Sequence, residues 1–235
     1  AALAVIGGTV LPPSVARLVA FRREMRGREE TCVRMQAGRW LTSSIVHDEV
    51  PATCHPLGPN NKLVLSPGID IKYDSVPGYS VEASAKMPHA WKSGTQVQVL
   101  KAQIEAMPEG GTFVMLAPPD PYRCPPGPYE RISMIGHLLK QKNPKAKILV
   151  LDPKEKFSKQ AVFQEGWERH YPGMIEWLPG SITGTIENVD VANMTITAGG
   201  ETYKADAATV IPAQKAGAIA EKAGLTDDKG WCPIK

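Results

Sequence analysis

Two of the four cysteines in this chain, Cys124 and Cys232, share a context, since each is followed directly by proline. Cys124 lies in the string YRCPPGPYE and Cys232 in GWCPI. A stiff loop suits a cysteine that does nucleophilic or redox chemistry, because it holds the sulfur at one position and angle. The two cysteines could meet across the ends of a sheet, or each could be an inert thiol. The spacing alone leaves both readings open.

A carboxylate, Glu130, follows Cys124 closely. We expect a helix to begin near residues 129–130, and the N-terminus of that helix would favour a thiolate on Cys124. Glu130 could relay protons to the sulfur, or it could be a first-turn carboxylate that stabilises the helix dipole. Both roles fit its position.

Residues 112–152 must position these side chains. The string TFVMLAP predicts a buried strand, ISMIGHLLKQ a helix and KAKILVLD a second strand, and together they form a βαβ unit. In a parallel sheet, ligands gather beyond the carboxyl ends of the strands, which is where Cys124 falls. A nucleotide-binding unit would carry glycines in this loop. Here the loop has six prolines: Pro118, Pro119, Pro121, Pro125, Pro126 and Pro128.

That proline loop argues against a dinucleotide at this position. Proline has no N–H to donate, so the loop cannot form the cradle that a pyrophosphate needs. Asp152 ends the second strand, where a nucleotide-binding unit would use it to contact a ribose. Without the glycines, we interpret Asp152 as a capping residue.

The other elements have weaker signals. Helical spacing predicts helices over residues 14–25, 96–107 and 214–224, the last of them stopped by Gly224. Residues 175–178 and the string VIP predict strands. Residues 194–198 alternate polar and apolar side chains, which is typical of an antiparallel ribbon, with turns at 189–193 and 199–200. The chain is therefore predicted to be α/β.

Composition excludes several classes of protein. A net charge of +3 and a pI near 8.6 are too mild to indicate nucleic-acid binding. No C-x-x-C pair is present, so we expect no metal site. No apolar run reaches the length of a transmembrane helix. The N-terminal string AALAVIGGTVLPPSVA could be part of a secretory signal, or a strand and turn that open a domain.

Residues 62–235 resemble the flavoprotein subunit of flavocytochrome c sulfide dehydrogenase, of which this chain is expected to be a partial copy. The motifs stand in the family's order. They are LVLSPGID, KYDSVPGYS, MPHAWKSG, YRCPPGPYER, FSKQAVFQEGW, YPGMIEWLPG, VIPAQKAG and GLTDDKGWCPI.

This resemblance implies an α/β fold of the glutathione-reductase type, with two dinucleotide-binding domains. Residues 1–68 would be a remnant of an incomplete FAD-binding domain. Residues 69–200 would form a largely intact second Rossmann-like domain, free of nucleotide and carrying an antiparallel β excursion. Residues 201–235 would end that domain and begin the return to the FAD domain.

The resemblance also implies the chemistry. Cys124 and Cys232 match the family's redox-active disulfide, which faces FAD, and Glu130 matches an acidic residue that helps to move protons. The turn at Ser66, Pro67 and Gly68 matches one that runs close to the cofactor. Hydrosulfide would be the substrate, a cytochrome c subunit the electron acceptor, and the periplasm the compartment.

Departures from the family pattern keep two alternatives open. The string GGTVLPPS is a poor copy of the glycine-rich FAD loop, and Cys54 only partly matches the family's site of covalent flavin attachment, with Cys32 a worse match. The alternatives are an NAD(P)H-dependent disulfide or quinone reductase, and a non-catalytic module that docks a cytochrome but lacks FAD.

Overall fold

A computed structural model describes residues 68–92 and 94–233, together with the backbone of four short strands nearer the N-terminus. The chain divides into two units, which are described separately. One unit is Ile71–Gln214, and the other combines Ala1–Asp70 with Lys215–Lys235. The predicted segment 201–235 therefore contains the last strands of the first unit, followed by residues of the second. The predicted helix over 14–25 lies outside the described residues.

The centre of Ile71–Gln214 is a four-stranded parallel sheet in the order β12-β6-β7-β8. Its strands are β6 (Thr112–Leu116), β7 (Lys147–Leu151), β8 (Ile175–Leu178) and β12 (Ala207–Val210). All of β12 and nearly all of β6 are buried, as expected for parallel strands covered on both faces. The predicted α/β class and the βαβ unit are confirmed.

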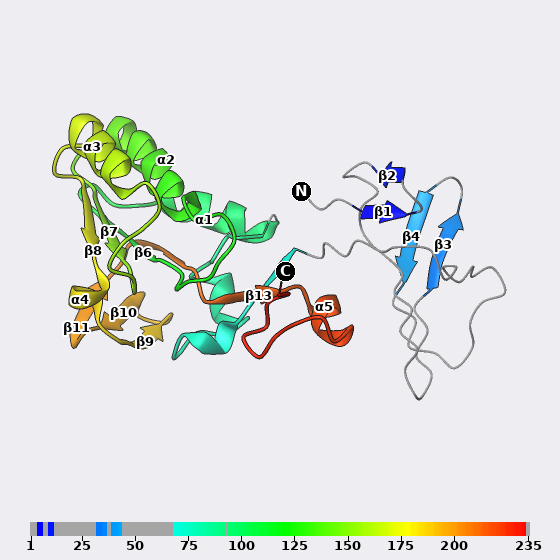
Figure 1. Ribbon diagram of the computed structural model, residues 1–235. Helices are drawn as coiled ribbons and strands as arrows, with labels where there is room; N and C mark the ends of the chain where they lie inside the picture. The colour runs from blue at the N-terminus through cyan, green and yellow to red at the C-terminus, as the bar shows by residue number, and fades with distance from the viewer. Residues whose placement is uncertain are drawn as a thin grey trace. The chain divides into compact units, whose positions relative to one another are not determined.

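Three longer helices lie next to this sheet (Figure 1). They are α1 (Thr95–Glu105), α2 (Gly127–Lys142) and α3 (Gln160–His170). α2 connects β6 to β7 and buries an apolar stripe that includes Ile132, Ile135 and Leu139, at the spacing of one helix face. α3 lies beside α2 (Figure 1), and α1 packs against β12. The sequence pattern thus located α1 within two residues at each end.

A three-stranded antiparallel sheet, in the order β11-β10-β9, packs on the sheet face that carries Val114 and Leu116. Its strands are β9 (Ile186–Asp190), β10 (Thr195–Ala198) and β11 (Glu201–Lys204). Gly199 and Gly200 both have positive φ, +60° and +81°, in the tight turn between β10 and β11. Such a turn requires positive φ at both central positions, so two glycines stand there. The predicted antiparallel excursion is confirmed.

Short elements complete Ile71–Gln214. They are the 3₁₀ turns η1 (Tyr73–Ser75) and η2 (Ala83–Ala85) and the four-residue helix α4 (Gly180–Thr183). β5 (Ile69–Ile71) and β13 (Gln214–Ala216) form a two-stranded sheet where the chain passes between the units.

The other unit is described in part. β1 (Ala4–Ile6) pairs antiparallel with β2 (Thr9–Leu11), and β3 (Cys32–Gln36) pairs antiparallel with β4 (Arg39–Ser43). Near the C-terminus, α5 (Ala218–Lys222) ends before Gly224. The predicted helix over 214–224 is wrong in its first part, because residues 214–216 pair with β5 as strand β13. Residues 214–224 contain several alanines, which suit a helix, but this local preference did not decide the structure of residues 214–216.

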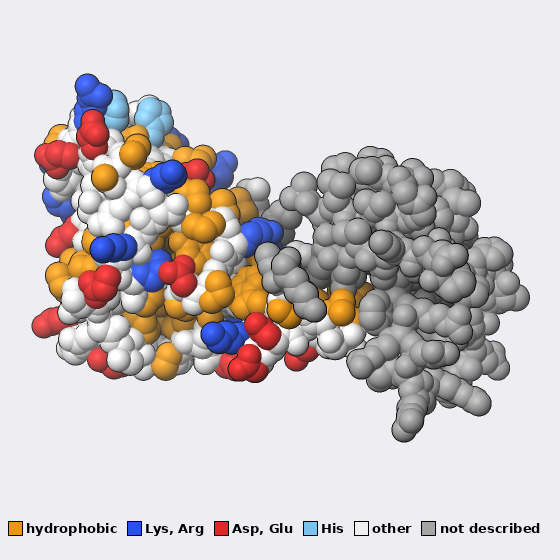
Figure 2. Space-filling model, in the orientation of Figure 1, with side chains coloured by type: hydrophobic (Ala, Val, Ile, Leu, Met, Phe, Trp, Pro, Cys, Tyr) orange, Lys and Arg blue, Asp and Glu red, His pale blue; other side chains and the backbone are white. Residues whose placement is uncertain are grey.

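The surface of Ile71–Gln214 mixes both signs of charge. On the face shown in Figure 2, Lys and Arg side chains are interspersed with Asp and Glu, and apolar atoms lie between them. None of the helices in the described part of the chain is long and apolar enough to span a bilayer. The same part of the chain holds no cluster of three or more His, Cys, Asp or Glu side chains able to ligate a metal ion.

Candidate functional site

Cys124 lies in the loop from β6 to α2, at the carboxyl edge of the parallel sheet. Its backbone is left-handed, with φ +63°, a conformation that non-glycine residues rarely adopt. The thiol is free and exposed. Two hydrogen bonds hold the loop: Tyr122 donates its hydroxyl to the Pro125 carbonyl at 2.7 Å, and Gly127 N–H donates to the Cys124 carbonyl at 2.8 Å. The loop holds the backbone of Cys124 in a strained conformation and so fixes the sulfur. Such strain is typical of functional positions.

The residue before the cysteine is anchored twice. Arg123 N–H donates to Gln214 Oε1 at 2.9 Å, and Arg123 Nη2 donates to the Trp91 carbonyl at 3.0 Å. Trp91 and Gln214 come from distant parts of the chain. They therefore hold the loop against the body of Ile71–Gln214 from two sides.

Gly127 allows an indole ring to approach the sulfur. A Cβ on Gly127 would lie 2.8 Å from Trp91 Cη2 and 3.3 Å from both Trp91 Cζ2 and Cys124 Sγ. The first distance is shorter than any real carbon contact, so a side chain at this position would force the ring away. Trp91 and the Cys124 sulfur thus border the same small volume.

A half-buried arginine holds Trp91. The Arg131 guanidinium lies 5.1 Å from the centroid of the indole ring, within cation–π range. It also donates to the carbonyls of His89 at 2.8 Å and Ala90 at 2.6 Å, and to Thr209 Oγ1 at 3.1 Å. Burial lowers the pKa of Arg131 to about 10, so the guanidinium stays charged at neutral pH. Arg131 fixes the segment that carries Trp91.

Glu130 is exposed in the first turn of α2. The helix begins at Gly127 rather than at the predicted 129–130, because prolines are tolerated in a first turn, where N–H groups have no helical acceptor. The described contacts of Glu130 include no hydrogen bond to Cys124. Its role in proton transfer stays a prediction.

Cys232, in the other unit, is also a free and exposed thiol. A compact turn precedes it, in which Asp227 Oδ1 accepts hydrogen bonds from the backbone N–H groups of Trp231 at 2.8 Å and Lys229 at 3.0 Å. Cys124 and Cys232 belong to different units, each described by itself. Their pairing in a disulfide stays a prediction.

Of the predicted cofactor-binding turn, only Gly68 is described; Ser66 and Pro67 lie outside the described residues, as does Cys54. Gly68 is exposed, has φ +78°, and has no atom within 4 Å of the place where a Cβ would stand. Its carbonyl accepts a hydrogen bond from Gly217 N–H at 3.0 Å. The approach of this turn to a cofactor stays a prediction. Cys32 opens β3, and its side chain is not described.

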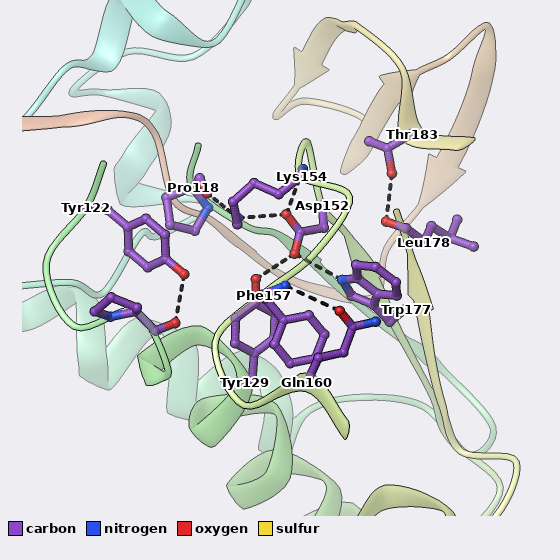
Figure 3. Close-up of polar contacts among 11 residues, drawn as sticks. Pro118, Tyr122, Tyr129, Asp152, Lys154, Phe157, Gln160, Trp177, Leu178 and Thr183 are labelled. Carbon is purple, nitrogen blue, oxygen red and sulfur yellow. Dashed lines mark hydrogen bonds and ion pairs between the residues drawn. The ribbon is translucent and has the colours of Figure 1, made fainter. Parts of the chain in front are cut away.

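Asp152 caps a backbone N–H in the turn after β7, as predicted, but it is also a buried hub (Figure 3). Its Oδ2 accepts hydrogen bonds from the Tyr129 hydroxyl at 2.6 Å and from Trp177 Nε1 at 3.0 Å. Its Oδ1 accepts from Lys154 N–H at 3.0 Å and lies 2.7 Å from Lys154 Nζ. Burial and the neighbouring Asp152 carboxylate raise the pKa of Tyr129 well above its ordinary value, so the phenol stays protonated and donates.

This network closes the position at which a dinucleotide would bind. Lys154 Nζ donates to the Pro118 carbonyl, at the start of the proline loop, and lies 5.1 Å from the centroid of the Tyr122 ring. Phe157 stacks on Tyr129, with ring centroids 3.6 Å apart. Both oxygens of Asp152 are engaged by protein donors, so none is left for a ribose. The proline loop and the carboxylate are joined to each other instead.

A comparison with known families bears on this arrangement. Residues 97–212, about half of the chain, match the family model described as the central part of the sulfide dehydrogenase (flavocytochrome c) flavoprotein chain. Through this region the chain belongs to that family. The match covers the Cys124 loop, Arg131 and the Asp152 network, while Trp91, Gln214 and Cys232 lie outside it. Membership in this family of flavoprotein oxidoreductases confirms the identity suspected from the sequence motifs.

Sequence reasoning missed Trp91, Arg131 and Gln214. Trp91 and Arg131 stand inside the quoted motifs MPHAWKSG and YRCPPGPYER, and Gln214 stands in VIPAQKAG, but no spacing rule assigns them a role. A half-buried cation beside a tryptophan is visible only once the chain is folded.

Proposed function

We propose that this chain is a sulfide-oxidising flavoprotein subunit that passes electrons from hydrosulfide through a Cys124–Cys232 disulfide and FAD to a cytochrome c. The observation that supports this most strongly is Cys124 itself. It is an exposed sulfur in a left-handed backbone, anchored at the carboxyl edge of a parallel sheet, inside the region that matches the family. The proposal places Ile71–Gln214 as the second domain of a glutathione-reductase-like fold, with FAD held by residues of the other unit.

The sulfur chemistry can be written on the two cysteines. Hydrosulfide attacks one sulfur of the disulfide, an S–S bond breaks, and a new S–S bond forms. One cysteine becomes a persulfide and the other a thiolate, so atoms and charge balance. A second hydrosulfide then attacks the outer sulfur of the persulfide and leaves with it as hydrogen disulfide, HSSH, so both cysteines are thiolates. Loss of an electron pair from the two thiolates restores the disulfide. A bound flavin would accept that electron pair and release electrons singly to the cytochrome.

The residues of this chain have separate parts in that sequence. The left-handed turn and the two bonds to Arg123 hold the Cys124 sulfur in place for attack, which lowers the entropic cost of the reaction. Glu130, exposed on the first turn of α2, is the candidate to accept the proton that hydrosulfide loses. A resting disulfide requires a compartment in which thiols are not kept reduced, so we place the protein in the periplasm.

The Asp152 network disfavours the NAD(P)H-dependent alternative. With the proline loop unable to cradle a pyrophosphate and with Asp152 saturated by internal donors, Ile71–Gln214 offers no dinucleotide site at the usual position. A non-catalytic cytochrome-docking module is the remaining alternative. That alternative assigns no function to the strained backbone of Cys124.

Two measurements test the proposal. A count of free thiols in the non-reduced protein should find two fewer than in the reduced protein; four free cysteines would contradict the disulfide. Addition of sulfide should bleach the visible flavin band of the FAD-containing protein, and addition of NADH should leave it unchanged. Bleaching by NADH would favour the reductase, and a folded protein that takes up no flavin would favour the docking module.

A further inference from the structure

Trp91 and Gln214 share two properties. Each accepts a hydrogen bond from Arg123, the residue before Cys124. Each also has a buried side-chain N–H, Trp91 Nε1 or Gln214 Nε2, that finds no acceptor among the described residues. The two side chains are well withdrawn from solvent, since Trp91 is 8% exposed and Gln214 is 2% exposed.

Such unpaired donors are unusual within Ile71–Gln214. Trp167 donates its Nε1 to Ser133 Oγ at 2.8 Å, and Trp177 donates to Asp152 Oδ2 at 3.0 Å. A buried donor without an acceptor costs about 1–3 kcal/mol. Here two such donors belong to residues that both accept hydrogen bonds from Arg123. This indicates that an acceptor reaches them in another state of the protein.

A neighbouring group that can change its accepting power is the sulfur of Cys124. The Cys124 sulfur and Trp91 Cζ2 both lie 3.3 Å from the position a Cβ would take on Gly127. Nε1 is two bonds from Cζ2, on the same side of the indole. A neutral thiol or disulfide sulfur is a weak acceptor, whereas an anionic sulfur is a strong one.

We propose that Trp91 Nε1 and Gln214 Nε2 donate hydrogen bonds to the anionic sulfur that forms on Cys124 when its disulfide opens. The inference rests on the proposed function only for the assignment of Cys124 as the reacting sulfur. These donors have no acceptor in the structure, where Cys124 is a neutral free thiol, and the anionic sulfur would supply one. They therefore stabilise the product of hydrosulfide attack more than the resting state, as an oxyanion hole does for oxygen.

A chain in which Cys32, Cys54 and Cys232 are replaced by serine isolates Cys124 for the test. Its thiol is first converted to a mixed disulfide with 5-thio-2-nitrobenzoate. Hydrosulfide then displaces the coloured arylthiolate and leaves a persulfide on Cys124. The indole N–H signals are followed by NMR in protein labelled with ¹⁵N-tryptophan, with Trp91→Phe used to assign the Trp91 signal.

The Trp91 N–H signal should move downfield when the persulfide forms, while the signals of Trp167 and Trp177 stay in place. A Trp91 signal that stays in place would overturn the inference. So would a signal that moves on addition of FAD but not on persulfide formation, because the cofactor would then be the acceptor. Failure of hydrosulfide to release the arylthiolate would count against the proposed function instead.

A second measurement needs no sulfide. In reduced protein, Trp91→Phe and Gln214→Glu should each slow alkylation of Cys124 by about threefold, since the loss of a stabilising hydrogen bond lowers the thiolate fraction more than it raises nucleophilicity. Gln214→Glu keeps an oxygen to accept from Arg123 N–H. Trp167→Phe is the matched control and should react at the unaltered rate. Equal rates in all variants would overturn the inference.

Discussion

Lys154 Nζ lies 2.7 Å from Asp152 Oδ1, and the two side chains are only 9% and 0% exposed. This buried ion pair lies at the carboxyl edge of the parallel sheet, and Lys154 also reaches the proline loop through the Pro118 carbonyl. The pair therefore joins the end of β7 to the loop that carries Cys124.

Breaking this pair should cost much more than breaking an exposed one. Lys154→Met leaves a buried carboxylate without its counterion, and we expect the free energy of unfolding to fall by about 3–5 kcal/mol. The matched control is Lys145→Met, which breaks an exposed pair with Glu109 at the same 2.7 Å. The control should cost under about 1 kcal/mol. Urea denaturation measures both, and equal losses would contradict a structural role for the buried pair.

Gly127 should tolerate no side chain. Gly127→Ala would place a Cβ 2.8 Å from Trp91 Cη2, so the indole must move or the loop must shift. We expect a loss of about 1–3 kcal/mol, as for other overpacked sites, and a change in the near-UV circular dichroism of tryptophan.

A glycine in α3 provides the control for that substitution. A Cβ on Gly166 would meet nothing within 4 Å, so Gly166→Ala should stabilise the helix by about 0.5–1 kcal/mol. The prediction fails if the two substitutions have effects of the same sign.

The left-handed backbone of Cys124 should lower the free energy of unfolding by a measurable amount. Cys124→Gly removes the Cβ that disfavours this conformation, whereas Cys124→Ala keeps it. Both remove the sulfur, so the glycine variant should be the more stable of the two by about 1 kcal/mol. Thermal and urea unfolding of the two variants give this difference directly. An alanine variant as stable as the glycine variant would show that the backbone there is unstrained.

The segment that carries Trp91 should be sensitive to acid. Burial, with the charges of Lys92 and Arg131, lowers the pKa of His89 to about 4. Neutral His89 accepts a hydrogen bond from Trp91 N–H on Nδ1 at 2.9 Å, and its Nε2 lies 3.1 Å from the Tyr73 hydroxyl.

Because the folded pKa lies below the unfolded value near 6.5, this stabilisation is present above pH 6.5 and is lost as the pH falls towards 4. His89 alone contributes at most about 1.4 kcal/mol per pH unit over that window. Chemical denaturation at several pH values should therefore show a smaller slope in His89→Gln than in the unsubstituted chain. Identical slopes would show that His89 does not contribute to this loss of stability in acid.

Local pattern was enough to predict the parts of this fold that depend on neighbours in sequence. The apolar runs of β6 and β7 and the stripe along α2 predicted the βαβ unit, and the two glycines at 199–200 predicted a turn. The helix predicted over 214–224 failed because residues 214–216 obtain their partner from β5, which lies far away in the sequence.

The surroundings of Cys124 could be predicted only in part. The proline loop singled out the cysteine, and the family motifs supplied a use for it. The anchors of that loop are tertiary, since Arg123 meets Trp91 and Gln214 only across the folded unit. For the same reason, the capping role predicted for Asp152 covers only one of its contacts. Its four donors come from the segment after β7, from α2 and from β8, and no spacing along the chain brings these together.

Cys124 is the residue on which the proposed reaction with hydrosulfide depends most. The most direct test mixes sulfide anaerobically with the FAD-containing chain and with its Cys124→Ser variant and follows the visible flavin band. We predict that the band bleaches rapidly in the unsubstituted chain and that the variant, loaded with the same amount of FAD, loses this rapid phase. Bleaching at the same rate in both proteins would contradict the assignment.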